Sequence, residues 1–398
     1  MRILFITPEL PYPLIKGYQV RGYHQLRLLS KRHRITLLSL VKGRVDQDNL
    51  DKLLPFVDEI VTIPVNQVRQ SFNVLSGVFS RLPLQTALYW NPRLAKLVNK
   101  YVNSGKYDIA YIQLARMAPH LINESRIPKV IDLVDSLSLN MQRRYQSDHR
   151  LLRPLIYKEW KRMALYEQEI CKAFDMATVV SNNDRETIGD YKNLKVNPLG
   201  VNLTDYAYIE PTIRKNTDTI VFTGNMSYFP NVNAADWFVR NVWAMIKIKI
   251  PTANLYIVGA NPTQPIVRLA EKDQSITVTG YVKNVHDYLS KAAISVAPLQ
   301  SGSGMQFKIL EAMACGTPIV ATSFALGGIS ALHERHLLVA NTAVEFAQSA
   351  VRLLKDMKLR QSLAETSRKM VEDVFSWEKC TEDFETALES VVSSHHAD

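Results

Sequence analysis

Short apolar and β-branched runs recur along the chain, and longer stretches with helical spacing of apolar residues separate them. Most of these runs are continuously apolar, which is typical of strands covered on both faces, as in parallel sheets. The first half predicts strands at 3–7, 35–40, 60–64, 109–113, 130–133 and 176–181. The second half predicts strands at 219–224, 255–259, 276–280, 294–298 and 318–322.

This alternation of strand and helix occurs twice, and it predicts an α/β fold with two doubly wound Rossmann-like domains. Proline, glycine and asparagine cluster at residues 197–202, directly after the last predicted element of the first half. We therefore predict a first domain at 1–198 and a second domain at 199–374. Residues 375–398 carry one apolar stripe at helical spacing, which predicts a separate C-terminal helix.

Charge is distributed unevenly along the 398 residues, which contain 48 Lys and Arg against 38 Asp and Glu, for a net charge of +10. Residues 1–200 hold 30 basic and 18 acidic residues, whereas residues 201–398 hold 18 and 20. A basic first half predicts an anionic partner: a membrane surface, a phosphate-bearing acceptor or nucleic acid. The ordinary content of hydrophobic residues, 46%, excludes disorder, collagen and coiled coil as the main class.

No apolar run approaches the length of about 18 residues that a membrane-spanning helix requires, so none is expected. The apolar run at the N-terminus is short and ends at Thr7, which predicts a buried strand instead of a signal peptide. Three scattered cysteines, Cys171, Cys315 and Cys380, predict buried free thiols in a reducing compartment. We expect a cytoplasmic protein, and peripheral association with the inner face of the membrane is an additional hypothesis.

The most basic stretch lies between residues 140 and 172, where the pattern predicts one long helix. Trp160, Met163, Glu167 and Ile170 recur at helical spacing and predict a stripe that faces the core. The interleaved basic residues form either a solvated face or a surface that attracts anionic lipid headgroups. Nucleic acid is not expected as a partner, because no recognised nucleic-acid-binding module accompanies the charge.

The clearest candidate site lies between residues 297 and 318, where the sequence predicts a strand, a glycine-containing loop, a helix and another strand. Gly302 and Gly304 allow the backbone to approach a ligand closely. The helix begins near Met305 or Gln306, and its first amide groups and positive dipole end favour a diphosphate.

Lys308 and Glu311 follow in the first turns of this helix and share one face. The helix dipole disfavours a cation at this end, so an anionic ligand would explain Lys308. The Glu311 carboxylate can accept hydrogen bonds from two hydroxyl groups, such as those of a ribose. The alternative is an exposed ion pair between Lys308 and Glu311 without a ligand.

This segment resembles the nucleotide-sugar signature of the family 4 retaining glycosyltransferases, which have the GT-B fold. Residues 311–322 match Glu-Ala-Met-Ala-x-Gly-x-Pro-x-Val-Ala-Thr, and segments 11–17 and 223–235 resemble enzymes that build bacterial surface polysaccharides. The similarity extends over essentially the whole chain. It implies two Rossmann-like domains that face each other across a cleft, with the helix at 375–398 crossing back to the first domain.

The resemblance implies a donor site in the second domain. Glu311 matches the glutamate that binds the nucleotide ribose, and Lys308 matches a basic residue that contacts the diphosphate. Gly224 closes the first strand of this domain, where the backbone meets phosphate or sugar. Tyr281 and Val282 match the loop whose main chain meets the base, and the alternative for both is ordinary packing at a strand end.

The chain departs from the family pattern at two places. Many relatives have a glutamate eight residues before the ribose-binding one, where this chain has Ser303, and we keep Ser303 and Gly304 in the predicted donor site. Many relatives also carry an arginine and a lysine after the first strand of this domain, but residues 225–228 contain neither. Lys308 is therefore expected to supply most of the positive charge that faces the phosphates.

The first domain also contains candidate residues. Gly17 lies between the first predicted strand and a helix, and we expect its backbone to approach the donor phosphate or the acceptor. Arg21 and His24 share a face of that helix. The alternatives are a solvated or salt-bridged arginine and an ordinary surface or core histidine.

Asp132 and Asp135 follow the strand predicted at 130–133, and α/β sheets bind ligands at the carboxyl ends of their strands. Many relatives have a histidine near this place that faces the transferred sugar. A carboxylate here orients or deprotonates an acceptor hydroxyl if its pKa suits that task. The alternative for Asp135 is the N-cap of a helix that begins near Ser136, and the choice between Asp132 and Asp135 stays open. The predicted catalytic residues are Asp135, Lys308 and Arg21.

We therefore expect a hexosyltransferase that moves a sugar from a nucleotide diphosphate donor to a glycan, lipid-linked or other hydroxyl acceptor, with retention implied by the resemblance. No cofactor and no metal ion are expected, because the sequence contains no cluster with metal-ligand spacing. The alternatives are an inverting transferase or a sugar-nucleotide epimerase with the same fold, or a catalytically silent nucleotide-sugar-binding protein.

Overall fold

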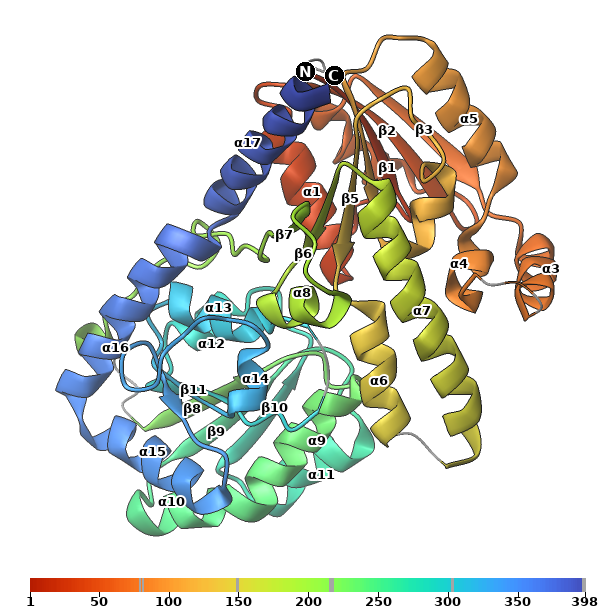
Figure 1. Ribbon diagram of the computed structural model, residues 1–398. Coiled ribbons are helices and arrows are strands. Elements are labelled where there is room, and N and C mark those ends of the chain that lie inside the picture. Colours follow the sequence, from red (N-terminus) through yellow and green to blue (C-terminus); the bar gives the residue numbers. More distant parts are fainter. Residues whose placement is uncertain (79, 81, 148–149, 215–217, 302–303, 396–398) are drawn as a thin grey trace. The chain divides into compact units, whose positions relative to one another are not determined.

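The computed structural model describes residues 1–398 except 79, 81, 148–149, 215–217, 302–303 and 396–398. The chain folds into two compact units (Figure 1). Residues Met1–Pro198 and Cys380–Asp398 form the first unit, and residues Leu199–Lys379 form the second. Each unit contains one sheet whose described strands pair in parallel, as the continuously apolar runs predict.

The sheet of the first unit has seven strands in the order β3-β2-β1-β4-β5-β6-β7. The central strands β4 and β5 are buried along their whole length, and most of their residues are apolar, with Gln113, Lys129 and Asp132 as buried polar exceptions. Because all strands run in the same direction, their carboxyl ends lie along one edge of the sheet. The strands are β1 (Arg2–Thr7), β2 (Arg34–Val41), β3 (Glu59–Pro64), β4 (Ile109–Gln113), β5 (Lys129–Val134), β6 (Met176–Val179) and β7 (Leu194–Val196).

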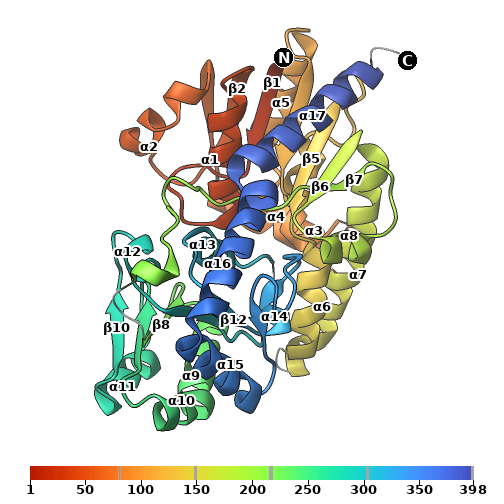
Figure 2. The same ribbon diagram turned by 90° about the vertical axis from the view of Figure 1, so that its left-hand side faces the viewer.

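Helices cover both faces of this sheet. Apolar residues of α5 and α7 pack on one face, and those of α1 and α17 pack on the other. In Figure 2, α17 runs across the face of the sheet. The helices are α1 (Gly17–Leu29), α2 (Gln47–Asp51), α3 (Gln67–Val78), α4 (Leu84–Tyr89), α5 (Pro92–Asn103), α6 (Leu137–Ser147), α7 (Arg153–Ala173), α8 (Asn182–Ile188) and α17 (Trp377–His395), with a short 3₁₀ helix η2 (Ala115–His120) after β4.

The C-terminal helix α17 contributes to the core of the first unit from Cys380 onward. The Phe384 ring lies 5.6 Å from the Tyr111 ring of β4, measured between centroids, in an edge-to-face arrangement. Leu388 is fully buried in the same cluster. The predicted apolar stripe of this helix is therefore its buried face.

The basic stretch forms two helices, α6 and α7, instead of the single long helix that the pattern predicted. Pro154 lies in the first turn of α7, and a proline ring cannot continue a helix from the preceding turn. Three of the four residues of the predicted stripe on α7, Met163, Glu167 and Ile170, are fully buried, whereas Trp160 is half-buried. None of the helices within the described ranges has the length and apolar character needed to cross a membrane.

The sheet of the second unit has six strands in the order β10-β9-β8-β11-β12-β13. The strands are β8 (Thr219–Thr223), β9 (Asn254–Val258), β10 (Ile276–Gly280), β11 (Ile294–Ala297), β12 (Ile319–Ala321) and β13 (Leu338–Val339). The helices are α9 (Phe229–Phe238), α10 (Ala244–Lys249), α11 (Gln264–Lys272), α12 (His286–Leu289), α13 (Phe307–Ala314), α14 (Ser323–Leu326), α15 (Ala343–Lys355) and α16 (Met357–Met370).

Candidate active site

The start of α13 in the second unit is tied by side chains to the loop that follows β8. The Lys308 amine donates a hydrogen bond of 2.5 Å to Asn231 Oδ1. The Asn231 amide in turn donates a hydrogen bond of 2.9 Å to the carbonyl of Asn225. Lys308 and the backbone beside Gly224 are therefore brought together, as a phosphate site requires.

Gly224 and Gly259 make this arrangement possible through a close approach of two loops. A Cβ atom at Gly259 would lie 1.8 Å from the Gly224 carbonyl oxygen, so no other residue fits there. A Cβ atom at Gly224 would lie 2.7 Å from the Asn231 amide nitrogen, and Gly224 has a φ of +154°. The backbone after β8 consequently stays bare of side-chain atoms where it meets Asn231.

Lys308 is almost fully buried, and its amine lies 4.9 Å from the centroid of the Phe222 ring. Burial lowers the pKa of this amine to about 7, against the opposing charge of Glu311. An anion bound beside the amine would raise its pKa again, because an opposite charge favours the protonated form. The Lys308 side chain is thus poised to gain a proton together with an anionic ligand.

Glu311 lies one turn further along α13, and its Oε1 atom accepts a hydrogen bond of 2.8 Å from the Tyr206 hydroxyl. Burial raises the pKa of this carboxyl group, whereas the Tyr206 hydrogen bond and the Lys308 charge act in the opposite direction. The alternative of an exposed ion pair between Lys308 and Glu311 is wrong, because the described contacts direct the two side chains to Asn231 and Tyr206. The Oε2 atom receives no hydrogen bond from the described residues and can accept one from a ligand hydroxyl.

The other predicted donor residues occupy loops of the same unit. Gly304 has a φ of +74° and lies before α13, which begins at Phe307, slightly later than predicted. Ser303 lies outside the described residues. Tyr281 follows the end of β10 and is 80% exposed, and Val282 comes directly after it. The described contacts do not join Tyr281 or Val282 to Lys308.

Two residues of this cluster, Asn231 and Tyr206, were missed by the sequence analysis. Asn231 is buried in the first turn of α9, among apolar neighbours. A buried side-chain amide needs a hydrogen-bond partner, so an asparagine at such a position indicates a specific contact. Tyr206 belongs to the connection that joins β7 to β8 in the sequence, where no hydrophobic periodicity marks it.

In the first unit, Asp132 and Arg21 form a fully buried ion pair. The Arg21 Nε atom lies 2.5 Å from Asp132 Oδ2, and both side chains are 0% exposed. Tyr111 and Thr178 also donate hydrogen bonds to Asp132, at 3.0 and 2.8 Å. Burial tends to lower the pKa of Arg21, but the charge of Asp132 raises it overall.

This network corrects the prediction that Arg21 takes part directly in catalysis. The Nη1 atom of Arg21 donates a second hydrogen bond, of 2.9 Å, to the carbonyl of Pro198. With its side chain buried and these donors paired, Arg21 holds β5 and the end of the first unit together and presents no surface to a ligand. The salt-bridged alternative describes Arg21 correctly, and its partner is Asp132.

Asp135 lies just beyond the end of β5 and is half-buried. The preceding residue, Val134, has a φ of +65°, an uncommon and strained conformation for a β-branched residue. Burial and the neighbouring Asp184 raise the pKa of Asp135 to about 6, and the Arg21 and Arg143 charges oppose this shift. A carboxylate with this pKa at a strand end is suited to accept a proton near neutral pH.

The cap of α6 does not involve Asp135. The Ser136 hydroxyl accepts a hydrogen bond of 3.2 Å from the backbone of Leu139. Glu167 of α7 accepts hydrogen bonds from the backbone of Leu137 at 2.6 Å and of Ser138 at 3.3 Å. The N-cap alternative for Asp135 is therefore wrong, and its carboxylate is available for another role.

Gly17 is exposed and is the first residue of α1, directly after the loop that joins β1 to α1. Beside it, the Lys16 amine and the Tyr18 hydroxyl both bind Glu9, at 2.6 and 2.8 Å. His24, further along α1, is buried, and burial lowers its pKa to about 3. His24 is thus a core histidine, as one of the two alternatives had it.

Within the described part of the chain, His33, Glu385 and Glu389 form one group of side chains close enough together to ligate a metal ion. His33 precedes β2 and therefore lies at the amino edge of the sheet, opposite the edge that carries Asp135. The His33 Nε2 atom lies 2.9 Å from Glu385, and Arg32 lies 3.4 Å from the same carboxylate. This group links α17 to the turn after α1.

Comparison with solved structures confirms the predicted architecture. HepE from Anabaena, in complex with UDP, superimposes with a TM-score of 0.67 at 14% identity, covering 98% of this chain and 100% of that one. Sucrose-phosphate synthase from Thermosynechococcus elongatus superimposes with a TM-score of 0.69 at 16% identity, covering 99% and 100%. Residues 217–356 match the family model of glycosyl transferases group 1. The chain therefore has the GT-B fold, and residues 217–356 of its second unit are similar to the glycosyl transferases of group 1.

Among individual proteins, the chain is similar to one from Klebsiella pneumoniae described as an uncharacterized 44.6 kDa protein in the cps region. The two are 21% identical over 393 residues, which cover 95% of this chain and 97% of that protein. The predicted resemblance to glycosyltransferases of this group is confirmed.

Proposed function

We propose that this chain transfers a sugar from a nucleotide diphosphate donor to a hydroxyl group of a glycan or lipid-linked acceptor, with retention of configuration. The observation that carries the proposal is the start of α13, where Lys308 reaches the loop of Gly224 through Asn231. Glu311 lies one turn further on the same helix. This spacing suits a diphosphate beside Lys308 and a ribose beside Glu311.

In the proposed reaction, the sugar leaves a nucleoside diphosphate, on which negative charge develops. Lys308 and the positive dipole end of α13 stabilise that charge, which is the main contribution of such sites to rate. Asp135 of the first unit accepts or orients the acceptor hydroxyl, supported by its raised pKa of about 6. We assign donor binding to the second unit and acceptor binding to the first.

The similar proteins suggest which donor and which acceptor to test first. Structures of HepE hold UDP, UDP with glucose, and UDP-glucose. The Klebsiella relative is encoded in a cps region. We propose a UDP-hexose as donor and a growing surface polysaccharide as acceptor.

Thermal-shift measurements with UDP, GDP, ADP, TDP and CMP test donor binding. A nucleotide at 100 times its dissociation constant stabilises the folded chain by about 2.7 kcal/mol. We expect UDP to raise the melting temperature of wild type and to act less on Glu311→Ala. Glu271→Ala, which removes an exposed glutamate from α11 of the same unit, is the matched control and should respond as wild type.

Either of two results would contradict the donor site: no nucleotide stabilises wild type, or Glu311→Ala responds fully. Once a donor is known, NMR analysis of the product anomer tests retention. An inverted product identifies an inverting enzyme, and turnover without acceptor identifies an epimerase. Binding without transfer or hydrolysis identifies a silent binding protein.

We further propose that transfer needs no added metal ion, since Lys308 and the helix start supply positive charge to the phosphates. Activity that survives EDTA supports this, and loss of activity that magnesium or manganese restores would contradict it.

We also propose that the beginning of α7, together with the 3₁₀ turn at Arg150–Leu152 that precedes it, attaches the enzyme to an anionic membrane surface. Leu151 of the turn is 83% exposed and Leu155 of α7 is 56% exposed, and Tyr157 of α7 is also exposed. Lys158 and Lys161 follow on the same helix, so apolar and basic groups alternate there. Such a surface suits lipids with negative headgroups.

Sedimentation with vesicles at low salt tests the membrane proposal. We expect binding to phosphatidylglycerol vesicles, little binding to phosphatidylcholine vesicles, and a loss of binding in the double variant Leu151→Ser, Leu155→Ser. Ile248→Ser removes an equally exposed apolar residue from the second unit and serves as the control. Equal binding by the double variant and the control would remove the proposal.

A further inference from the structure

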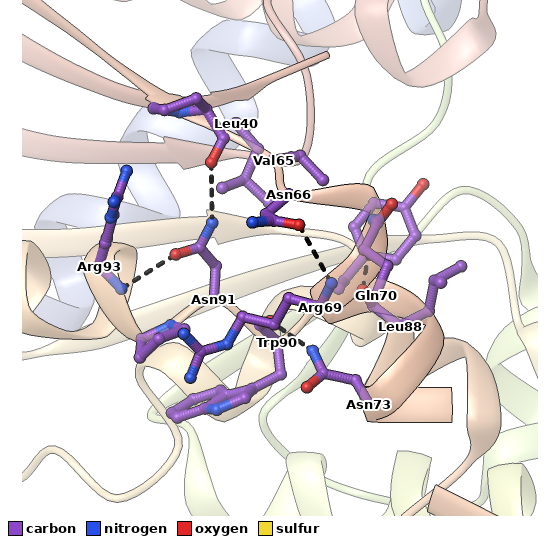
Figure 3. Close-up of a pocket in the computed structure, with 13 residues that line it drawn as sticks. Leu40, Val65, Asn66, Arg69, Gln70, Asn73, Leu88, Trp90, Asn91 and Arg93 are labelled. Atoms are coloured by element: carbon purple, nitrogen blue, oxygen red, sulfur yellow. Dashed lines mark hydrogen bonds between the residues drawn. The ribbon is translucent and has the colours of Figure 1, made fainter. Parts of the chain in front are cut away.

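The first unit contains a pocket of about 410 Å³ that is separate from Asp135 (Figure 3). Its wall is built from the carboxyl ends of β2 and β3, from α3, and from the connection between α4 and α5. Thirteen residues line it, and neither an aspartate nor a glutamate is among them.

Amide side chains hold the wall of this pocket in place. Asn73 of α3 donates a hydrogen bond of 2.9 Å to the carbonyl of Trp90. Asn91 donates a hydrogen bond of 3.4 Å to the carbonyl of Pro64, and its oxygen accepts one of 2.9 Å from the backbone of Arg93. Figure 3 shows both amides directed at backbone atoms of the wall, to which dashed lines join them. The walls are therefore ordered before a ligand enters.

An aromatic ring with a fixed orientation is part of the same wall. Trp90 stacks on His120, with 5.0 Å between ring centroids and an angle of 24° between the planes. Trp90 nevertheless keeps 37% of its surface exposed. The neighbouring Tyr89 is held by Arg116, whose guanidinium lies 5.1 Å from the ring centroid. A rigid, partly exposed indole is a surface on which the apolar face of a sugar ring can pack.

The pocket is also positively charged. Arg69 and Arg93 both line it, and both are exposed. Among the described residues, neither guanidinium pairs with a carboxylate. An arginine that has no acidic partner in the protein is free to bind a carboxylate or phosphate of a ligand through two parallel hydrogen bonds.

We infer that this pocket binds a sugar unit that carries an anionic group and belongs to the acceptor. Trp90 packs against the pyranose, the amides bind hydroxyl groups, and Arg69 and Arg93 bind the carboxylate or phosphate. The inference rests on the proposed function, because a glycosyltransferase is what gives this chain a glycan acceptor.

The position of the pocket identifies this sugar as a unit distant from the reacting hydroxyl. β1 and β4 lie between β2, which ends at the pocket, and β5, which ends at Asp135. Adjacent strands are about 4.8 Å apart, so roughly 14 Å separate these strand ends. Tyr89 and Arg116 also lie close enough to Tyr18 to affect its pKa, which burial and Glu9 raise. The pocket thus adjoins the start of α1. An oligomeric acceptor can extend from the pocket to Asp135 along the edge formed by the carboxyl ends of the strands.

Binding of defined oligosaccharides to the full chain tests the inference. The probes are trigalacturonic acid, its neutral methyl ester, glucose 6-phosphate and inorganic phosphate, each measured by calorimetry. We expect trigalacturonic acid to bind about tenfold more tightly than its ester, a difference that corresponds to about 1.4 kcal/mol. Tighter binding of glucose 6-phosphate than of trigalacturonic acid would assign the anionic group as phosphate instead of carboxylate.

Variants separate the contribution of the two arginine charges from that of packing against Trp90. Arg69→Gln with Arg93→Gln should reduce the affinity for the acid to that of the ester, and Trp90→Ala should weaken both about tenfold. Lys100→Gln removes a charge from α5 outside the pocket and should change nothing. The inference fails if no oligosaccharide binds, if acid and ester bind equally, if inorganic phosphate binds as tightly as the sugars, or if the variants bind as wild type.

Stabilisation by UDP in the same variants distinguishes this inference from the proposed function. If UDP still binds but no oligosaccharide does, only the inference about the pocket is refuted. An absence of UDP binding in wild type would instead remove the donor site on which the inference rests.

Discussion

Lys308 is a lysine whose surroundings bring its titration close to neutral pH. Burial lowers its pKa to about 7, and the nearest polar contact is the neutral amide of Asn231. A bound diphosphate would raise the pKa, so binding at pH 8 should draw a proton from solution.

We predict that UDP binding at pH 8 takes up close to one proton per site. Calorimetry in two buffers with different ionisation enthalpies measures this number directly. At pH 5.5 the amine is already protonated and uptake should be near zero. Lys308→Gln should abolish the pH 8 uptake and weaken binding, whereas equal uptake in the variant would show that another group titrates.

Asp135 provides the second prediction at this scale. Its pKa of about 6 means that the carboxylate is lost as the pH falls through 6. If the ionised form accepts the acceptor proton, kcat/KM should fall about tenfold per pH unit below this value. Asp135→Asn should lower kcat/KM strongly and remove this acidic limb. A variant that retains the limb would assign it to a different group.

Single residues show which signals a sequence carries and which it does not. Lys308 and Glu311 were predicted as donor-site residues from a glycine loop before a helix and from a resemblance to a family motif, and both signals are local in the sequence. Arg21 was assigned a catalytic role because nothing near it in the sequence reveals its partner Asp132, which lies 111 positions away. Asn231 and Tyr206 were missed for the same reason, since their partners lie 77 and 105 positions away.

At the scale of elements, the start of α6 depends on a side chain from another helix. Glu167 of α7 accepts two backbone hydrogen bonds there, and burial raises its pKa to about 7. Since the folded-state pKa lies above the ordinary value of 4.5, the proton contributes stability at low pH that is lost as the pH rises through 7.

We predict that Glu167→Ala lowers the free energy of unfolding by about 1–3 kcal/mol, because two buried amides lose their acceptor. Glu167→Gln keeps an acceptor and should cost less. Its stability relative to wild type should also improve as the pH rises from 4.5 to 7, since glutamine does not titrate. Urea denaturation across this range measures both effects, and a difference that is independent of pH would contradict the assignment.

The predicted elements were most accurate in the middle of each sheet. Central strands such as β4 and β5 are buried on both faces, and their largely apolar runs gave their positions. The edge strands β7 and β13, with 3 and 2 residues, were not predicted, because so short a run has no periodicity. The division between α6 and α7 was also missed, although Pro154 marks it.

At the scale of the whole molecule, the last helix completes the core of the first unit. Phe384→Ala should destabilise this unit by about 3–5 kcal/mol, since a buried aromatic ring leaves a cavity. The measurement is thermal unfolding with and without UDP. Ser390→Ala, an exposed position on the same helix, should leave the melting temperature unchanged.

UDP should still stabilise the second unit of the Phe384→Ala variant, because Phe384 does not belong to that unit. A loss of the UDP effect in this variant would show that the two units do not fold independently.

Residues 199–379 form a compact unit whose two ends meet. The backbone of Val201 donates a hydrogen bond of 2.7 Å to Phe375, and a Cβ atom at Gly200 would lie 2.7 Å from the Trp377 Cα. A compact segment that leaves and re-enters the rest of the chain at neighbouring points can be exchanged by gene fusion through only two junctions. We predict that exchanging residues 199–379 for the corresponding segment of a relative leaves the fold of the first unit intact, and, if the proposed donor site is correct, that it changes the donor sugar.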